Sequence, residues 1–505
     1  MVNSRTLRAV SLRSLLPTTS FVGCADVPAY HVTDHHEQCV PGSLFVAIAG
    51  TRHDGRKYIA DAVANGAVSI LVDEPQTDVT VPQCVVPNVR DAFSQICLTL
   101  ASRPDRAMDL TGVTGTNGKT TVTWLLQSIF ESAGRTCGRV GTIDFSDGRA
   151  TRPASQTTPG PIEFTQLLGR MQANGVKNAF VEISSHALDQ SRLGGLRLAS
   201  AVITNVTQDH FDYHGGPAEY LTAKERIADY CSYDAPLVVN ADDAGCQQLI
   251  PRWQRRRVIR FGLNSGTDSR GEILEMHEDH TRARFEILGE RFECDIPLIG
   301  RHNVSNCVAA ATVAVAANIP TDRIAHGLTS LKFVPGRLQP VKTGQKFRVF
   351  VDYAHTPDAI SQVVSALRPT TAGRLICVFG AGGDRDASKR PLLGAAASAA
   401  DVVVVTSDNP RSEDPSDIIA QVREGVAGVD CHVEVARRTA IEWAIGNARY
   451  GDCVLITGKG HETTQQIGDV QVPFDDRMVA TEVLAELNHK PKPAASLARE
   501  ASWTQ

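Results

Sequence analysis

The segment 114–121, Thr-Gly-Thr-Asn-Gly-Lys-Thr-Thr, constrains the fold more than any other part of this chain. It follows a strand-like segment, residues 109–114, and leads into a segment of helical character, residues 120–134. A strand that ends in a glycine-rich turn and opens a helix with Lys-Thr is a phosphate cradle, because backbone N–H groups and the helix N-terminus face the anion. Lys119 stands where a lysine neutralises phosphate, and Thr120 where a hydroxyl binds Mg²⁺. The segment therefore predicts an α/β domain with a nucleotide site.

The glycine spacing of this loop departs from the common phosphate-loop pattern. That pattern has a glycine five positions before Gly118, whereas this chain has Val113 there, flanked by Gly112 and Gly115. A plain glycine-rich turn at a helix start is the alternative. We favour phosphate binding because strand, loop, Lys-Thr-Thr and helix follow in the required order.

The bulk composition is that of an ordinary globular protein. The chain has 505 residues, with 42% hydrophobic and 21% charged side chains, a length that suggests about three domains. The net charge is −5 and no Lys/Arg run supports a nucleic-acid partner, so we expect none. The 12 cysteines are scattered without metal-ligand spacing, and no apolar run reaches membrane-span length. We expect a cytoplasmic protein with reduced thiols, no membrane segment and a monomeric state.

Alternation of strand-like and helix-like segments predicts an α/β fold throughout. We expect a small N-terminal α/β domain over residues 1–98 and a central parallel-sheet, phosphate-loop domain over residues 99–335. A doubly wound, Rossmann-like domain is expected over residues 336–490, followed by a tail, 491–505. The segments expected to form strands are residues 43–49, 68–72, 109–114, 179–183, 201–205, 236–240, 347–352, 375–380, 402–407 and 454–457, and those expected to form helices include 56–65, 120–134, 218–230 and 303–318.

Three polar positions after the phosphate loop are metal-site candidates. Glu182 ends an expected strand, and an acid there can hold Mg²⁺ across from a phosphate loop, although a surface role is as common. Residues 205–215, Asn-Val-Thr-Gln-Asp-His-Phe-Asp-Tyr-His-Gly, hold two His and two Asp within six positions, and the alternative is a polar loop that caps a helix. Lys224 lies in an expected helix, where a lysine is normally solvated.

The loop 114–121 resembles the ATP loop of the Mur ligase family, which also includes folylpolyglutamate synthetase, and the resemblance covers nearly the whole chain. Residues 205–215 are similar to the family signature Asn-x-Thr-x-Asp-His-x-Asp-x-His-Gly, which implies that His210 serves a second Mg²⁺. Tyr-Leu-x-Ala-Lys-x-x-Ile-Ala at 220–228 implies that CO₂ carbamylates Lys224 and makes it a carboxylate-like metal ligand. The metal residues implied are Thr120, Glu182, His210 and Lys224.

The resemblance also implies the contacts to ATP. Asn303 and Asn306 would bind adenine, although a helix N-cap at Asn303 or Ser305 is an alternative. Arg337, in Pro-Gly-Arg, resembles the family arginine that reaches the phosphates, and Asp352 resembles the ribose-binding acid, with capping of a turn as the alternative. The loop residues implied are Gly115, Thr116, Asn117, Gly118, Lys119, Thr120 and Thr121. The catalytic residues implied are Lys119, Glu182, His210, Lys224 and Arg337.

Three polar loops follow expected strands of the last domain, at residues 382–391, 408–411 and 458–462. Open α/β sheets bind ligands at such strand ends, and together the loops offer Arg for a carboxylate and Glu for an ammonium, which suits a zwitterionic amino acid. Asp-Asn-Pro-Arg at 408–411 resembles the motif of family members that add meso-diaminopimelate rather than L-lysine. Lysine would leave a buried Arg411 unpaired. The residues implied are Arg390, Asp408, Asn409, Pro410, Arg411, Gly458 and Glu462.

The resemblance places UDP on the N-terminal domain and the muramoyl-peptide on Ser-Gln-Thr-Thr-Pro, residues 155–159. The match is weaker at the UDP end. The chain has Asp-His-His at 34–36 where the family usually shows Asp-Ser-Arg, and Thr-Arg-His at 51–53 where many members show His-Gln-Ala. The residues implied are Asp34, His35, Thr157, Thr158, Ser184, Gln190 and Arg192.

The resemblance implies an ATP-dependent ligase that joins meso-diaminopimelate to UDP-N-acetylmuramoyl-L-alanyl-D-glutamate, with Mg²⁺ and the lysine carbamate as cofactors. A folylpolyglutamate synthetase is the nearest alternative, and residues 408–411 and 157–159 count against it. An ATPase or nucleotide switch is a second alternative. A binding module without catalysis is a third, against which Lys119, Glu182, His210 and Lys224 all argue.

Overall fold

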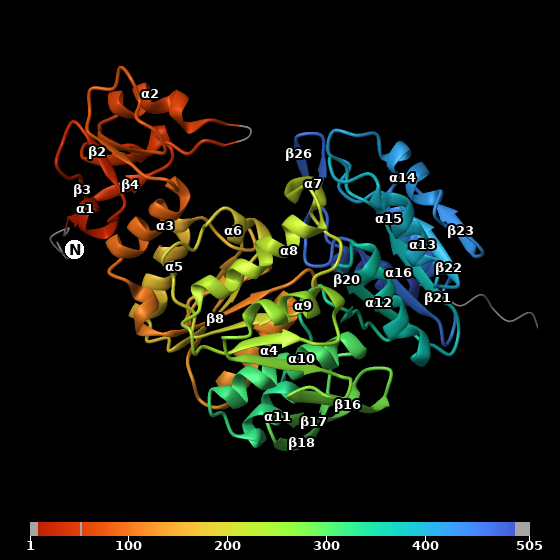
Figure 1. The fold of residues 1–505 in the computed structure, drawn as a ribbon. Helices are drawn as coiled ribbons and strands as arrows, with labels where there is room; N and C mark the ends of the chain where they lie inside the picture. The colour runs from red at the N-terminus through yellow and green to blue at the C-terminus, as the bar shows by residue number, and fades with distance from the viewer. Residues whose placement is uncertain (1–8, 51–52, 490–505) are drawn as a thin grey trace, which may run out of the picture. The chain divides into compact units, whose positions relative to one another are not determined.

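The structure is a computed structural model that describes residues 9–50 and 53–489. The chain divides into two compact units, Met1–Val334 and Pro335–Gln505 (Figure 1). The expected tail 491–505 and the positions Thr51 and Arg52 lie outside the described residues.

The first unit begins with a five-stranded sheet in the order β2-β7-β6-β5-β4. Strands β4 to β7 are parallel and β2 is antiparallel to β7. All four residues of β5 are buried, as expected for a parallel strand covered on both faces. The expected helix 56–65 forms in two steps, because a 3₁₀ turn, Gly55–Tyr58, precedes α2, Ile59–Ala64. The remaining bounds are β2 Ser20–Val22, β4 His31–Thr33, β5 Ser43–Val46, β6 Ala67–Val72, β7 Gln83–Val85 and α3 Val89–Leu100.

The same unit continues into an eleven-stranded sheet with β8, Asp109–Thr114, between β12, Asn178–Glu182, and β13, Ser200–Ile203. The inner strands are parallel, which brings their carboxyl ends to one edge. Antiparallel strands extend the sheet at both ends, and the sequence analysis did not anticipate them. The other strands are β9 Cys137–Val140, β10 Asp144–Ser146, β11 Thr151–Pro153, β14 Leu237–Asn240, β15 Val258–Gly262, β16 Ser269–Met276, β17 Thr281–Ile287 and β18 Glu290–Ile296.

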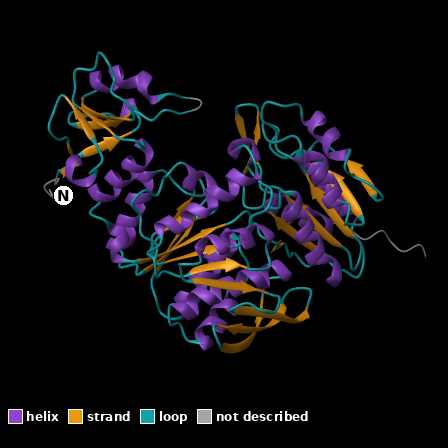
Figure 2. Ribbon diagram, viewed as in Figure 1, coloured by secondary structure: helices purple, strands orange, loops and turns teal. Residues whose placement is uncertain are grey.

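Helices cover both faces of this sheet (Figure 2). Leu110 and Val113 of β8 belong to different apolar clusters, because side chains three positions apart on a strand point to opposite faces. Three helices pack together over the Val113 face: α4 Lys119–Ser132, α10 Arg301–Ala316 and α11 Thr321–Ser330. The opposite face carries α5 Pro161–Ala173, α6 Ser185–Asp189, α8 Pro217–Glu225 and α9 Ala244–Leu249, and α7 Phe211–His214 contacts α8.

The second unit holds a six-stranded sheet in the order β19-β20-β24-β21-β22-β23. All of its strand pairs are parallel except β19 with β20. A hairpin, β25 Thr464–Ile467 with β26 Val470–Pro473, follows the sheet. The bounds are β19 Gln339–Pro340, β20 Arg348–Asp352, β21 Leu375–Phe379, β22 Val402–Val405, β23 Asp430–Val433, β24 Cys453–Thr457, α12 Pro357–Leu367, α13 Lys389–Ala397, α14 Pro415–Arg423, α15 Arg437–Asn447 and α16 Asp476–His489.

The expected fold class is therefore confirmed, with an N-terminal α/β sheet, a central mainly parallel sheet with a phosphate loop, and a Rossmann-like last domain. Within the described ranges, none of the helices has both the length and the apolar character needed to cross a bilayer.

Candidate active site

The phosphate loop runs from the end of β8 into α4 and requires two glycines. Gly115 has φ +149°, and a Cβ there would lie 1.9 Å from the Thr204 hydroxyl oxygen. Gly118 has φ +85°, and its Cβ would lie 2.6 Å from Oδ1 of Asn306. The Lys119 ammonium donates to the carbonyls of Gly115 and Thr116, at 2.8 and 2.9 Å. The expected loop conformation is present, and α4 begins at Lys119, one residue earlier than expected.

The residues after β13 hold the loop from the side. The side-chain oxygen of Asn205 accepts from the Asn117 N–H at 2.8 Å, and the Thr204 hydroxyl donates to the Asn117 carbonyl at 2.6 Å. The Thr116 hydroxyl lies 3.0 Å from the Tyr220 hydroxyl and donates to the Thr207 carbonyl at 3.1 Å. The loop is thereby tied to α8 and to the segment that contains His210.

Glu182, the last residue of β12, is fully buried beside the phosphate loop. The hydroxyls of Thr120 and Thr142 both donate to its Oε2, each at 2.9 Å, and the Thr142 N–H donates to its Oε1 at 3.0 Å. A Cβ on Gly141 would lie 2.1 Å from the same Oε1. The carboxylate is therefore held from two sides, and it presents hard oxygen atoms next to the Thr120 hydroxyl.

Thr142 is a residue of the site that was not expected from the sequence. Its hydroxyl also lies 3.1 Å from that of Thr157, so one side chain joins Glu182 to the segment 155–159. Thr142 follows β9, which pairs in parallel with β12, so the two strand ends meet at one edge of the sheet. Residues 137–140 were not among the expected strands, and recognising that strand, with Gly-Thr directly after it, was the signal that could have found Thr142.

Lys224 lies inside the protein rather than on the helix surface, with 1% exposure. Its ammonium sits 4.5 Å from the centre of the Tyr220 ring, and among the described residues no acid forms an ion pair with it. Burial holds the pKa of Lys224 well below its usual range, repulsion from Lys119 lowers the pKa further, and Asp209 opposes the shift. An amine kept neutral in this way is nucleophilic.

His210 is the residue before α7, with φ +53°, and no side-chain hydrogen bond from it caps that helix. Its ring packs against His186, with centres 4.8 Å apart, and His186 also contacts Tyr213, at 4.1 Å. Burial lowers the pKa of His186 to about 4, and repulsion from His214 and Arg192 contributes. His210 is thus supported by aromatic packing and by Asp209, whose carboxylate lies 3.3 Å from its Nε2.

The four implied metal residues do not all touch one another. Thr120 and Glu182 are in direct contact, and Lys224 lies close enough to Lys119 for the two charges to interact. Over the part of the chain that the structure describes, no three His, Cys, Asp or Glu side chains gather as a metal site. Oxygen donors from Thr120 and Glu182 suit Mg²⁺, and an amine that becomes a carbamate would add further oxygens.

The two asparagines of α10, Asn303 and Asn306, lie inside the helix and not at its N-cap. Helix α10 begins at Arg301 with Gly300 as its N-cap, so a capping role for Asn303 or Ser305 is wrong. The Asn303 amide donates to the Ile299 carbonyl at 2.8 Å, and the Asn306 amide donates to Oδ1 of Asn303 at 3.3 Å. These contacts place the Asn306 carboxamide against Gly118 of the phosphate loop.

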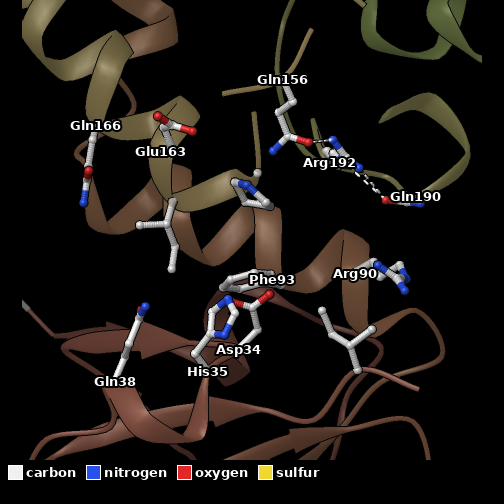
Figure 3. Close-up of a pocket in the computed structure, with 14 residues that line it drawn as sticks. Asp34, His35, Gln38, Arg90, Phe93, Gln156, Glu163, Gln166, Gln190 and Arg192 are labelled. Atoms are coloured by element: carbon white, nitrogen blue, oxygen red, sulfur yellow. Dashed lines mark hydrogen bonds and ion pairs between the residues drawn. The ribbon is translucent and has the colours of Figure 1, made fainter. Parts of the chain in front are cut away.

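A cavity of about 540 Å³ lies between the N-terminal sheet and α5 in the first unit (Figure 3). Four residues implied for the UDP-muramoyl-peptide line it: Asp34, His35, Gln190 and Arg192. The cavity is mixed in character, with cations, acids, amides and apolar side chains. Gln156, within the implied segment 155–159, also lines it, and the other main lining residues were not expected from the sequence: Gln38, Arg90, Phe93, Glu163 and Gln166.

Thr157, Thr158 and Ser184 do not line this cavity but connect it to Glu182. The Thr158 hydroxyl donates to the Glu182 carbonyl at 2.8 Å and accepts from the Ser184 N–H at 3.0 Å. Arg192 donates to the Thr158 carbonyl at 2.8 Å and to Oε1 of Gln190 at 2.9 and 3.1 Å. One hydrogen-bonded chain therefore runs from the cavity to the strand end beside the phosphate loop.

Arg337 and Asp352 lie in the second unit. The Arg337 guanidinium stacks over the Tyr353 ring at 4.4 Å. The Asp352 carboxylate accepts from the N–H groups of Leu338 and Ala354, at 2.6 and 2.7 Å, so the turn-capping contacts considered above are present.

The loops after β22 and β24 meet through a buried lysine that the sequence analysis did not single out. Lys459 is fully buried, and its ammonium donates to Oδ1 of Asn409 at 3.0 Å and to Oε2 of Glu462 at 2.9 Å. The Asn409 amide donates to the same Glu462 oxygen at 3.0 Å. Asp408 packs against Gly458, whose φ is +115° and whose Cβ would lie 2.5 Å from the Asp408 carboxylate.

The two implied arginines have different environments. Arg390 is 2% exposed, and it donates to Gln421 and Glu413, each at 2.8 Å, so these two contacts fix the position of its guanidinium. Arg411 has φ +51° and donates to the Gly383 carbonyl. Burial lowers the pKa of Arg411, and the charge of Arg385 adds to that shift. Arg411 is the better candidate to receive a carboxylate, because a partly desolvated cation gains most from one.

Three family models match this chain: the Mur ligase middle domain over residues 113–314, the glutamate ligase domain over residues 336–460, and the Mur ligase family catalytic domain over residues 37–99. Among relatives, the UDP-N-acetylmuramoyl-L-alanyl-D-glutamate–2,6-diaminopimelate ligase of Solibacter usitatus is 40% identical, covering 88% of this chain and 91% of its own. The protein of the same name from Gloeobacter violaceus is 38% identical, covering 95% and 99%.

A solved structure of a UDP-N-acetylmuramoyl-L-alanyl-D-glutamate–2,6-diaminopimelate ligase also matches. It is 30% identical, with a TM-score of 0.67, and the match covers 95% of this chain and 100% of that one. The matches in sequence and in structure thus extend over nearly all of the chain, and this chain belongs to the Mur ligase family.

Proposed function

We propose that this protein is an ATP-dependent ligase that adds meso-diaminopimelate to UDP-N-acetylmuramoyl-L-alanyl-D-glutamate, a step in the synthesis of cytoplasmic peptidoglycan precursors. One observation carries the proposal. The phosphate loop and the segment 155–159 converge on Glu182, through Thr120 on one side and through Thr142 and Thr158 on the other. A ligase that activates a carboxylate with ATP needs the nucleotide and the acceptor at one place.

The residues of the first unit suit formation of an acyl phosphate. The γ-phosphoryl group passes from ATP to an oxygen of the D-glutamyl carboxylate, which leaves ADP and gives a mixed anhydride. Lys119 and the loop N–H groups stabilise the charge on the phosphoryl oxygens, and Arg337 is assigned the same task. Mg²⁺ held by Thr120, Glu182, His210 and carbamylated Lys224 would neutralise phosphate charge.

The residues of the second unit suit the amine. Glu462, oriented by Lys459 and Asn409, accepts hydrogen bonds from an ammonium, and Arg411 binds the distal carboxylate. The deprotonated amino nitrogen then attacks the acyl carbon. The tetrahedral intermediate loses inorganic phosphate, the nitrogen loses a proton, and the amide bond remains.

The cavity shown in Figure 3 suits the UDP-muramoyl part of the acceptor, because it offers Arg90, Arg192 and His35 for phosphate oxygens and Phe93 for a ring. His35 stands where the family usually has serine. We propose that this histidine supplies a phosphate contact. The protein would act as a monomer, which light scattering would test.

Release of ADP tests this function. We expect turnover with the UDP-dipeptide and meso-diaminopimelate together, and little turnover when either is omitted. Hydrolysis that is independent of both substrates would instead identify an ATPase, and turnover with a folate acceptor would identify a folylpolyglutamate synthetase.

Arg411 should set the choice of amino acid. We expect meso-diaminopimelate to be preferred over L-lysine by at least about a hundredfold in kcat/KM, because lysine leaves the guanidinium unpaired. Arg411→Ala should remove most of that preference, while Arg423→Ala, an exposed arginine on α14, should preserve it. Equal rates with lysine in the unaltered enzyme would contradict the assignment of Arg411.

A further inference from the structure

The second unit contains an ion pair that the reaction described above does not use. Arg437, the first residue of α15, and Asp476, the first residue of α16, both have side chains with 0% exposure. The guanidinium binds the carboxylate through Nε at 2.8 Å and Nη2 at 2.7 Å. Burial alone would lower the pKa of Arg437, but the charge of Asp476 and its hydrogen bonds outweigh burial, so the pKa is raised.

The same guanidinium also binds two backbone carbonyls that belong to the amino-acid loops. Nη1 donates to the Ser407 carbonyl at 3.2 Å, and Nη2 donates to the Thr457 carbonyl at 2.9 Å. Ser407 directly precedes Asp408, and Thr457 directly precedes Gly458. One side chain therefore fixes the distance between the starts of the loops 408–411 and 458–462.

The space around the Arg437 guanidinium is filled, so the guanidinium has little room to move. Nη2 of Arg437 would lie 3.8 Å from a Cβ on Gly458, and the Asp408 carboxylate fills the same space. The charges of Asp408 and Glu462 both raise the pKa of Arg437, so the guanidinium lies within electrostatic reach of both acids. A shift of this cation would move the two loops and change the potential at both carboxylates.

Fold stability alone does not account for a charge pair at this position. A buried ion pair is often no more stabilising than apolar side chains of the same size, because desolvation offsets the attraction between the charges. The opposite edge of the same sheet carries a second pair, Arg374 with Asp452, at 2.8 Å, where Arg374 is 39% exposed. That pair joins the segments that enter β21 and β24 and touches neither amino-acid loop.

We propose that Arg437, held by Asp476, is a positioning residue that sets the spacing of the loops 408–411 and 458–462 and thereby the affinity for the amino-acid substrate. This role rests on the proposed function, because it takes those loops as the site of that substrate. It predicts that the pair controls the KM for the amino acid and not the KM for ATP, because the hydrogen bonds of Arg437 go to Asp476 and to the starts of the two loops and to none of the residues assigned to ATP.

The test uses Arg437→Lys in the full-length enzyme. Lysine keeps the charge but has a single nitrogen, so it cannot bind both carbonyls and both carboxylate oxygens. We expect the KM for meso-diaminopimelate to rise about tenfold, equivalent to about 1.4 kcal/mol, with the KM values for ATP and for the UDP-dipeptide within about twofold. Asp476→Asn, which leaves the guanidinium in place, should raise the same KM by a smaller factor.

Arg374→Lys is the matched control, because it alters an arginine–aspartate pair of the same sheet away from the loops. It should lower the melting temperature without changing the KM for the amino acid. If Arg437→Lys does not fold, the double variant Arg437→Met/Asp476→Leu removes the buried charges together, which often preserves stability. It should show the same selective rise in KM.

Two results would overturn the proposal: an unchanged KM for the amino acid in a folded Arg437 variant, or a parallel rise in all three KM values. Failure of the proposed function is seen separately, in the unaltered enzyme, as absence of turnover with meso-diaminopimelate. In that case the proposal is judged on the KM for whichever amino acid the unaltered enzyme accepts.

Discussion

Lys224 and Lys459 are both buried lysines, but their surroundings differ. Lys459 lies between Asn409 and Glu462 and donates to both, whereas Lys224 faces the Tyr220 ring and has no ion-pair partner among the described residues. A buried ammonium without a counter-ion is costly and becomes neutral, while a paired one stays charged and holds its partners in place. The difference separates a lysine suited to chemical modification from a lysine suited to positioning other groups.

Among the changes that test this comparison of the two lysines, removal of Lys224 should have the largest effect on ligase activity. Lys224→Ala should reduce ligase activity by about a thousandfold, because the carbamate that would complete the metal site is lost. Short carboxylic acids should restore part of the activity by filling the space with a carboxylate. Lys177→Ala, which alters an exposed lysine, is the control. Full activity of Lys224→Ala without any added acid would exclude carbamylation.

Replacing each lysine by methionine should change the free energy of unfolding differently at the two positions. Lys459→Met should cost about 2 kcal/mol, because the two hydrogen bonds that the ammonium donates, to Asn409 and to the Glu462 carboxylate, are lost. Lys224→Met should leave stability unchanged or higher, since an apolar side chain replaces an unpaired amine. Calorimetry in EDTA and CO₂-depleted buffer would measure both changes. Equal losses in the two variants would mean that Lys224 has a partner of its own.

Thr142 tests whether Glu182 depends on its hydroxyl contacts. Thr142→Val should weaken metal binding about tenfold, because groups that orient a metal ligand typically contribute that much. Thr142→Ser keeps the hydroxyl and should retain the affinity. Mn²⁺ binding in the presence of ADP, followed by electron paramagnetic resonance, gives a measure independent of turnover. Equal affinities in the valine and serine variants would remove the role assigned to Thr142.

The smallest effect is expected at His186, which shares its aromatic cluster with His210. The pKa of His186 falls from 6.5 to about 4 on folding, so between these values the unfolded chain binds the extra proton. Stability should therefore decrease as the pH falls from about 6.5 towards 4. His186→Gln should make this decrease shallower, and His277→Gln, an exposed histidine, should not. An unchanged pH profile in His186→Gln would show that another group controls it.

The parts of the fold that local pattern determines were predictable. The strand 109–114 has the expected bounds, because a glycine-rich turn and a helix follow it directly and mark where it ends. The antiparallel strands β16 to β18 were not anticipated, although residues 281–287 alternate between buried and exposed positions as such strands do. That signal was present and was not used.

Site residues that belong to a sequence motif were predictable. Site residues that are identified only by a contact with a distant part of the chain were not. Glu182 and Lys224 follow from the family resemblance, but burial of the lysine does not follow from an expected helix position. The contact of Thr142 with Glu182 spans 40 residues, and that of Arg437 with Asp476 spans 39. Such pairings depend on which strand and helix ends meet, and no local spacing encodes them.

Arg411 illustrates how selection on this enzyme differs from selection on its fold. A non-glycine residue at φ +51° carries backbone strain of about 1 kcal/mol, which glycine would relieve. A laboratory search for heat resistance alone would favour replacement of Arg411. A search for cells that grow with a diaminopimelate-containing wall would retain Arg411. Heat-stable variants that have lost amino-acid discrimination should therefore be easy to obtain. Position 411 is the first place where a substitution would raise stability and lower selectivity for the amino acid.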